Sequence, residues 1–225
     1  VLALVGAFFF GVFILILVVG LAVLTWLILT LRLWWLRRRW NGRAGGRGQD
    51  PFVREDRLRS LGQDLDRYLA ASYVLELLRA WTRPALPNPP LYRAGLTTLG
   101  ALAAAPRGAL PAWVAFFEAR AVDATGHRPR LDACAACGGE LQGAIVFSPA
   151  AGGLAHPDCA PPGPRRAVGP AAREALVRLY TARIRELAEA PLGPQELRAV
   201  RQIHDLQIPH LLERRPQALA SIPRA

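Results

Sequence analysis

The chain of 225 residues contains no lysine, no methionine and only three cysteines. Without lysine there is no phosphate-binding loop of the Gly-x-x-x-x-Gly-Lys type and no amine that forms Schiff bases. The Gly-x-Ser-x-Gly turn that presents a nucleophilic serine is missing as well. These absences exclude the common nucleotide-driven motors and covalent hydrolases, and they favour a protein that is not an enzyme.

The few cysteines form one pattern with a histidine. Cys134 and Cys137 are spaced i, i+3, and His156 and Cys159 repeat that spacing further along the chain. Two such pairs offer four thiolate or imidazole donors, which is the ligand set of a closed, tetrahedral Zn²⁺ site. A glycine pair beginning at Gly138 allows the tight turn that points both thiolates inward. The sequence therefore predicts structural Zn²⁺ held by these four side chains.

Other chemistries for the cysteines fit less well. A disulfide framework would leave one cysteine unpaired, and a thioredoxin-like redox pair would need a surrounding βαβ pattern. A zinc deaminase would need His-x-Glu upstream of the cysteine pair, and a zinc hydrolase would need an open metal position with a general base. The alternative that stays open is a relic of a structural site that no longer binds metal.

The first 31 residues carry no charged side chain, and their only polar side chains are Thr25 and Thr30. About 20 apolar residues suffice to cross a bilayer. Residues 32–40 then set arginines beside tryptophans, as on the cytoplasmic flank of a membrane helix. We expect residues 1–40 to be a hydrophobic transmembrane-like segment inserted through residues 1–31, or else the product of a fragmentary or frameshifted gene.

A glycine-rich linker at residues 41–52 separates this segment from the body at residues 53–225. Apolar residues at helical spacing predict helices at 54–81, 91–105, 110–124, 170–189 and 194–212, the last kinked or split by Pro209. Strands at 144–148 and 154–156 would form a hairpin within the metal segment, 131–160. The predicted fold class is mainly α: a helical domain with an inserted zinc-bound β-hairpin, preceded by the transmembrane-like helix.

Six different short motifs follow one another along the body. They are Leu65–Tyr73, Pro87–Leu91, Phe116–Arg120, Gly126–Asp132, Phe147–Gly153 and Leu219–Ile222. Taken together, they resemble the C-terminal part of the RecO family of bacterial recombination mediators, over about residues 54–222. In two respects the chain departs from the family. His156 stands where zinc-bearing members have a fourth cysteine, and the family's N-terminal OB-fold barrel has no counterpart in residues 1–50.

The resemblance implies a non-catalytic protein of DNA repair and homologous recombination. It implies binding and annealing of single- and double-stranded DNA, and contacts with the single-strand-binding protein and with RecR. It also implies that the protein helps to load the recombinase onto strands coated by single-strand-binding protein. The implied location is cytoplasmic and nucleoid-associated, or the inner membrane if the N-terminal segment anchors the chain.

Arginine carries the entire positive charge of the chain, whose formal net charge is +11. Arginines in Pro/Gly-rich loops reach phosphates in bidentate fashion. We expect DNA contacts near the metal hairpin and the C-terminus, at Arg128, Arg130, Arg165, Arg166, Arg214 and Arg215. The rival interpretation is a membrane-anchored zinc-hairpin adaptor that binds a protein partner and no DNA.

Overall fold

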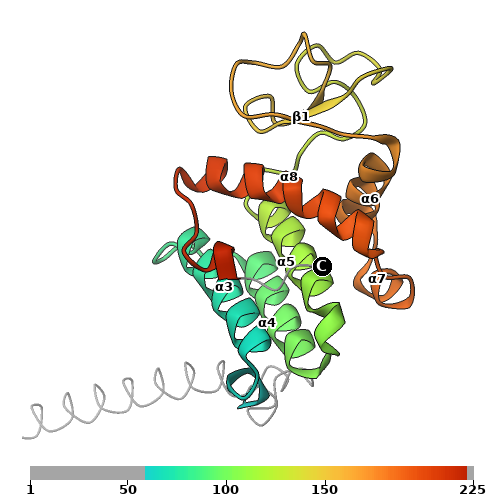
Figure 1. Ribbon diagram of the computed structural model, residues 1–225. Helices are drawn as coiled ribbons and strands as arrows, with labels where there is room; N and C mark the ends of the chain where they lie inside the picture. Colours follow the sequence, from blue (N-terminus) through green and yellow to red (C-terminus); the bar gives the residue numbers. More distant parts are fainter. Residues whose placement is uncertain (1–58, 222–225) are drawn as a thin grey trace, which may run out of the picture. The chain divides into compact units, whose positions relative to one another are not determined.

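Three long helices form the first half of the body in the computed structural model, which describes residues 59–221 (Figure 1). They are α3 (Leu65–Trp81), α4 (Pro89–Ala104) and α5 (Leu110–Ala124). Each packs against the other two. Their shared interior contains Tyr73, Leu77, Leu91, Leu102 and Phe117, all almost fully buried. The helices predicted at 91–105 and 110–124 are confirmed.

The helix α3 begins later than the sequence predicts. The reason is Asp64, whose side chain accepts the backbone N–H of Arg67 at 3.1 Å and so caps the first turn. A 3₁₀ turn, η1 (Ser60–Gly62), precedes this cap. The predicted start at residue 54 lies outside the described residues.

Several apolar residues of α3 that follow helical spacing are not buried by the fold. Leu65, Tyr68 and Leu75 are 69%, 56% and 54% exposed. The buried face includes Ala70 and Val74, which are fully inaccessible. The helix carries apolar residues on both faces, and the smaller alanines on one of them permit close helix packing.

Three further α-helices follow within the described residues: α6 (Pro170–Thr181), α7 (Ile184–Glu189) and α8 (Pro194–Leu212). The single helix predicted at 170–189 is therefore wrong, because the backbone is extended at Ala182 and Arg183. Arg120 of α5 donates to the carbonyls of Leu179 and Ala182 at 3.1 and 2.6 Å, which satisfies the open end of α6. Pro209 lies inside α8 without splitting it.

A small sheet lies between α5 and α6 in the chain. Its strands are β1 (Val146–Ser148), β2 (Gly153–Ala155) and β3 (Arg166–Ala167), in the order β2-β1-β3. Both pairings are antiparallel, with Phe147 opposite Leu154 and Arg166. The predicted hairpin is confirmed, whereas β3 was not predicted, since its two residues follow a proline-rich connector and carry no strand pattern.

The described body is mainly helical with one small sheet, in agreement with the predicted fold class for this part of the chain. Within residues 59–221, no helix combines the length and the hydropathy that a membrane span requires. The predicted transmembrane-like segment, the linker and the boundaries at residues 40 and 52 lie outside the described residues.

Candidate metal centre and surface arginines

Two tight turns present the four candidate metal ligands. In the first, the N–H of Gly138 donates to the carbonyl of Cys134 at 2.8 Å, with Gly138 at φ 76°. A side chain at that φ would be strained, which explains the glycine after the second cysteine. In the second turn, the N–H of Cys159 donates to the carbonyl of His156 at 3.0 Å. Each turn folds its two donor side chains toward the same side.

The four ligand atoms of Cys134, Cys137, His156 and Cys159 all lie within 4.8 Å of one another. His156 Nδ1 is 3.6 Å from the Sγ of Cys137 and 3.7 Å from that of Cys159. In a tetrahedral zinc site with ordinary bond lengths, a sulfur and a nitrogen ligand are about 3.6 Å apart. The donor set and its spacing therefore fit a closed Zn²⁺ shell.

The ring of His156 is oriented by a second contact. Its Nε2–H donates to the carbonyl of Glu140 at 2.9 Å. This bond fixes the tautomer, so the lone pair of Nδ1 faces the two sulfurs. A backbone carbonyl that accepts from the second ring nitrogen in this way commonly supports a metal-binding histidine.

The electrostatics around the sulfurs also suit a cation. Backbone N–H groups, that of Cys137 first, lower the pKa of Cys134 to about 6. The hydrogen bond with Cys137, together with burial and the neighbouring sulfurs, raises the pKa of Cys159 to about 11. Three thiolates at such close quarters repel one another, and a divalent ion relieves that repulsion.

The metal segment is anchored in the hydrophobic core of the body. Cys134, Phe147 and Leu154 are fully buried and share one apolar cluster with residues of α5, α6 and α8. The backbone of Arg130 pairs with Gly153, donating from its N–H to Gly152 and accepting from Leu154. Cys137, in contrast, is exposed. One ligand thus faces the core and another the solvent.

Three of the six arginines predicted to contact DNA are paired with acids. Arg128 lies 3.8 Å from Asp123, Arg130 lies 3.5 Å from Asp132, and Arg214 lies 3.3 Å from Glu76. All three guanidinium groups are about half exposed. An exposed ion pair of this kind is weak, so a phosphate competes with the carboxylate at little cost.

The other three are not neutralised by acids. Arg165 donates to the carbonyl of Pro157 at 3.0 Å, and Arg166 donates to the side-chain carbonyl of Gln202 at 2.9 Å. Arg215 is exposed and has no ion-pair partner within residues 59–221.

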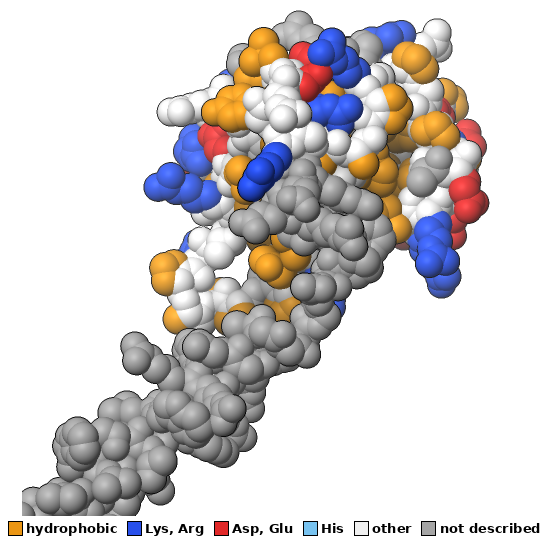
Figure 2. Space-filling view, turned by 90° about the horizontal axis from the view of Figure 1, so that it is seen from below, with side chains coloured by type: hydrophobic (Ala, Val, Ile, Leu, Met, Phe, Trp, Pro, Cys, Tyr) orange, Lys and Arg blue, Asp and Glu red, His pale blue; other side chains and the backbone are white. Residues whose placement is uncertain are grey.

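The segments that carry the six arginines adjoin α8, through the contacts of His127 with Gln207 and of Arg166 with Gln202, and at the C-terminal end of α8. The structure brings them to one helix but does not gather them into one cluster. Seen from below, arginines are likewise spread over the visible face rather than concentrated in a single stripe (Figure 2).

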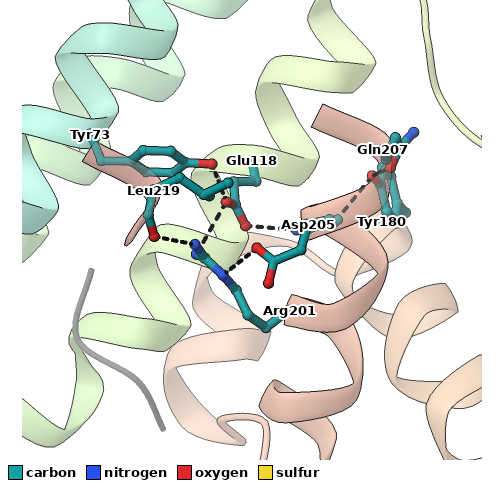
Figure 3. A network of polar contacts seen from close by, with 8 residues as sticks. Tyr73, Glu118, Tyr180, Arg201, Asp205, Gln207 and Leu219 are labelled. Carbon is teal, nitrogen blue, oxygen red and sulfur yellow. Dashed lines mark hydrogen bonds and ion pairs between the residues drawn. The ribbon is translucent and has the colours of Figure 1, made fainter. Parts of the chain in front are cut away.

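A buried polar network that the sequence analysis missed fastens α8 to the helical bundle (Figure 3). Glu118 of α5 lies at its centre with no exposed surface. It accepts from Tyr73 at 2.6 Å, from His204 Nδ1 at 2.7 Å and from Arg201 at 3.3 Å. The sequence offers only a weak signal for this network, because Glu118 shares α5 with Arg120 and Asp123, and only its burial shows that its carboxylate needs partners.

Burial by itself would raise the pKa of Glu118. The hydrogen bond and charge of His204, the charge of Arg201 and the hydrogen bond from Tyr73 outweigh that effect, and the pKa of the carboxyl is lowered. Glu118 is therefore held as a carboxylate inside the protein. The network supports the fold rather than a reaction, since every acceptor position of the carboxylate faces a structural partner.

Comparison with known proteins adds to this geometry. Residues 62–220 match the family profile described as "Recombination protein O C terminal". Among curated proteins, the chain is similar to "DNA repair protein RecO" of Anaeromyxobacter sp. (strain Fw109-5), with 39% identity over 156 residues, 68% of this chain and 60% of the relative. The same protein of Roseiflexus sp. (strain RS-1) is 34% identical over 174 residues, 76% of this chain and 59% of the relative.

The protein of that name from Moorella thermoacetica is 40% identical over a shorter stretch of 105 residues, 44% of this chain and 37% of the relative. The chain thus spans about three fifths of the length of the first relatives. No solved structure shows a significant match.

Proposed function

Because the chain belongs to the RecO family, whose C-terminal domain it contains, we propose that it is a DNA-binding mediator of DNA repair and homologous recombination. The observation that carries this proposal is the match over residues 62–220, which spans every described α-helix and the four clustered ligands. In this role the protein binds single- and double-stranded DNA and anneals complementary strands. It also helps to load the recombinase onto strands coated by single-strand-binding protein.

The protein partners in this proposal are the single-strand-binding protein and RecR, and the site of action is the nucleoid in the cytoplasm. The charge of the chain supports contact with DNA. The arginines that no acid neutralises, Arg165, Arg166 and Arg215, are free to exchange weak contacts for phosphate oxygens. The acid-paired Arg128, Arg130 and Arg214 would add to these contacts at low salt.

We also propose that the cysteine–histidine cluster holds one structural Zn²⁺ ion. The ion would be bound by Cys134, Cys137, His156 and Cys159, and it would cross-link the two turns that carry them. Four protein ligands leave no position for an activated water, so the ion would serve the fold and take no part in a reaction. This assignment agrees with a mediator that is not an enzyme.

Binding of a fluorescent single strand to the zinc-loaded chain, measured by anisotropy across a range of salt, tests the mediator role. We expect affinity to fall steeply from about 50 to 300 mM salt, because each neutralised phosphate adds about −0.7 to the log–log slope. An annealing assay with complementary strands follows on the same sample. Absence of DNA binding even at low salt would instead support the alternative function, a membrane-anchored adaptor that binds a protein partner. The apolar sequence of residues 1–31 is the observation that favours this alternative.

Substitution of the histidine tests the zinc assignment. His156→Cys keeps four ligands and should retain one zinc per chain, whereas His156→Ala should lower zinc affinity by at least about 100-fold. Metal content by elemental analysis and competition with a chelating dye give both numbers. His127→Ala, at an exposed histidine away from the cluster, is the matched control. Equal zinc affinity in His156→Ala and the unmodified chain would remove His156 from the ligand set.

A further inference from the structure

The loop that joins α3 to α4, Thr82–Asn88, forms one wall of a hollow that none of the predicted contacts uses. The hollow has a volume of about 600 Å³, and its lining includes Leu78, Arg83, Leu86, Pro87 and Tyr92. Arg83 is the one charged residue among the described residues that line it, and no acid does. A volume of this size accommodates a nucleobase together with part of its sugar.

Two large apolar side chains on the rim of this hollow are turned toward solvent; we call the hollow and the loop beside it the α3–α4 corner. Leu86 and Tyr92 are 66% and 65% exposed. Single exposed apolar residues are ordinary, but an aliphatic and an aromatic side chain on the rim of one hollow form a surface that gains free energy when it is covered. The ring of Tyr92 is the exposed aromatic surface of this hollow.

The charge around the corner has a single sign. Between Glu76 and Glu118 the sequence contains four arginines and no acid. Arg107 is occupied by Asp64, with 2.6 Å between Nε and the carboxylate. The remaining three are Arg79 in the last turn of α3, Arg83 in the loop and Arg93 near the start of α4, and none has an ion-pair partner within residues 59–221.

Glu76, the acid of α3 that precedes these arginines in the sequence, already has hydrogen-bond and ion-pair partners. The carboxylate of Glu76 accepts the backbone N–H groups of Gln217 and Ala218, each at 2.9 Å, and pairs with Arg214 at 3.3 Å. Its charge is therefore offset by the C-terminal segment. The three unpaired arginines keep a positive field that favours an anionic ligand.

The corner is also held in shape before any ligand arrives. Four prolines, at positions 84, 87, 89 and 90, restrict the backbone of the loop and of the first turn of α4. Asn88 caps α4 by accepting from the N–H of Leu91 at 3.1 Å, and its amide donates to the carbonyl of Ala124 at 2.9 Å. A rigid site loses little conformational entropy on binding.

We propose that this corner is a stacking site for single-stranded nucleic acid. One base covers the ring of Tyr92 and the side chain of Leu86, while Arg83, which lines the hollow, holds a neighbouring phosphate. Arg79 and Arg93, which come before and after this loop in the sequence, add positive charge to the same region of the chain. Exposed aromatic rings beside unpaired arginines are the combination that binds single strands without sequence preference. The proposal rests on the DNA-binding function proposed above, and it uses none of the six arginines that the sequence predicts for that function.

The test uses the full zinc-loaded chain and an oligothymidine of about 20 nucleotides. Tyr92→Ala should weaken binding by about 5- to 100-fold, the range expected for one lost stacking contact. Tyr92→Phe keeps the ring and should bind within about twofold of the unmodified chain. Arg83→Gln should weaken binding and lower the salt slope by about 0.7. Tyr68→Ala, at a tyrosine that is 56% exposed on α3, is the matched control and should bind normally.

A second measurement needs no substitution. An oligonucleotide that carries iodouracil is cross-linked to the unmodified chain by light, and the modified peptide is identified by mass spectrometry. A cross-link at Tyr92 supports the site. If the strand binds but Tyr92→Ala matches Tyr68→Ala and the cross-link lies elsewhere, the corner site is refuted and the mediator proposal stands. If the unmodified chain binds no strand at low salt, both fail.

Sedimentation of the same proteins separates nucleic acid from self-association. A dimer that Tyr92→Ala converts to a monomer, with unchanged affinity for the strand, would make the corner an interface between copies of the chain and would overturn the stacking site.

Discussion

At the scale of single residues, Glu118 connects three helices of the body through its buried carboxylate. It is fully buried, and its partners are Tyr73 of α3 and two residues of α8, Arg201 and His204. Arg201 bonds to Glu118 and also donates to the carbonyl of Leu219 at 3.5 Å. Removing one member of a buried, charged network leaves the others without compensation, which costs more than the contact itself is worth.

We therefore predict that Glu118→Gln lowers the free energy of unfolding by about 3 kcal/mol, because His204 and Arg201 then face a neutral amide. Denaturant titration followed by circular dichroism gives the value. Glu174→Gln, at an exposed acid on α6, should change it by less than about 0.5 kcal/mol. A loss of similar size in both variants would mean that the network contributes nothing specific.

The lowered pKa of Glu118 also predicts how stability depends on pH. Its folded pKa lies below the unfolded value, so the unfolded chain takes up the proton first as pH falls. The contribution of Glu118 to the free energy of unfolding is complete above about pH 5. It is lost as pH falls through the folded pKa, by up to about 1.4 kcal/mol per pH unit.

Glu76 and Asp64 have lowered pKa values as well and act in the same direction, but they are unchanged in Glu118→Gln. The stability gap between the unmodified chain and this variant should therefore narrow as pH falls from about 6 to 3. Parallel denaturant titrations in a chelator, which removes metal from both proteins, measure the gap. A gap that stays constant over that range would show that Glu118 titrates alike in the folded and unfolded chains.

At the scale of secondary-structure elements, the parts set by local sequence were predictable and the parts set by distant contacts were not. α5 begins at Leu110 and ends at Ala124 as predicted, and the four candidate metal ligands meet because each pair needs only a short turn and the predicted hairpin lies between the pairs. The break between α6 and α7 depends on Arg120, about 60 residues away, which binds the carbonyls at the end of α6. No periodicity in residues 170–189 carries that information.

The pairing of β3 with β1 and the network around Glu118 were missed for the same reason. Glu118 and His204 are 86 positions apart, and each taken alone is an ordinary residue of an amphipathic helix. The exposed stripe on α3 is the converse case. Leu65, Tyr68 and Leu75 follow helical spacing, yet spacing alone does not say which of two apolar faces is buried.

The backbone pairing of Arg130 with Gly153 leads to a further prediction. A Cβ added to Gly153 would lie 2.3 Å from the carbonyl oxygen of Arg130 and 2.6 Å from its nitrogen, so the backbone pairing of these two residues requires glycine. Gly153→Ala should destabilise the protein by about 2–3 kcal/mol through this overlap. Gly108→Ala, where nothing lies within 4 Å, is the control for thermal unfolding. Equal melting temperatures would rule out a tight Arg130–Gly153 contact.

At the scale of the whole described body, α5 lies between two apolar clusters. Phe117 and Ala121 belong to the cluster shared with α3 and α4. Phe116 and Ala119 belong to the cluster that contains Phe147 and other residues of the metal segment, together with α6 and α8. The metal segment therefore rests on one side of α5 only. A loss of metal should be felt first on that side, because the bundle of α3 and α4 has its own interior.

We predict that chelation of the metal speeds amide hydrogen exchange in residues 131–168 by at least about tenfold, and leaves α3 and α4 nearly unchanged. The proposed ion would hold two turns that have few backbone bonds of their own, whereas Tyr73, Leu77 and Leu102 pack in a separate cluster that the ion does not touch. Hydrogen exchange with mass spectrometry, with and without chelator, compares the two regions in one sample, and His156→Ala should reproduce the chelated pattern without any chelator. Equal loss of protection in α3 and α4 would show instead that both clusters unfold as one cooperative unit, in which the metal stabilises the helical bundle as much as its own turns.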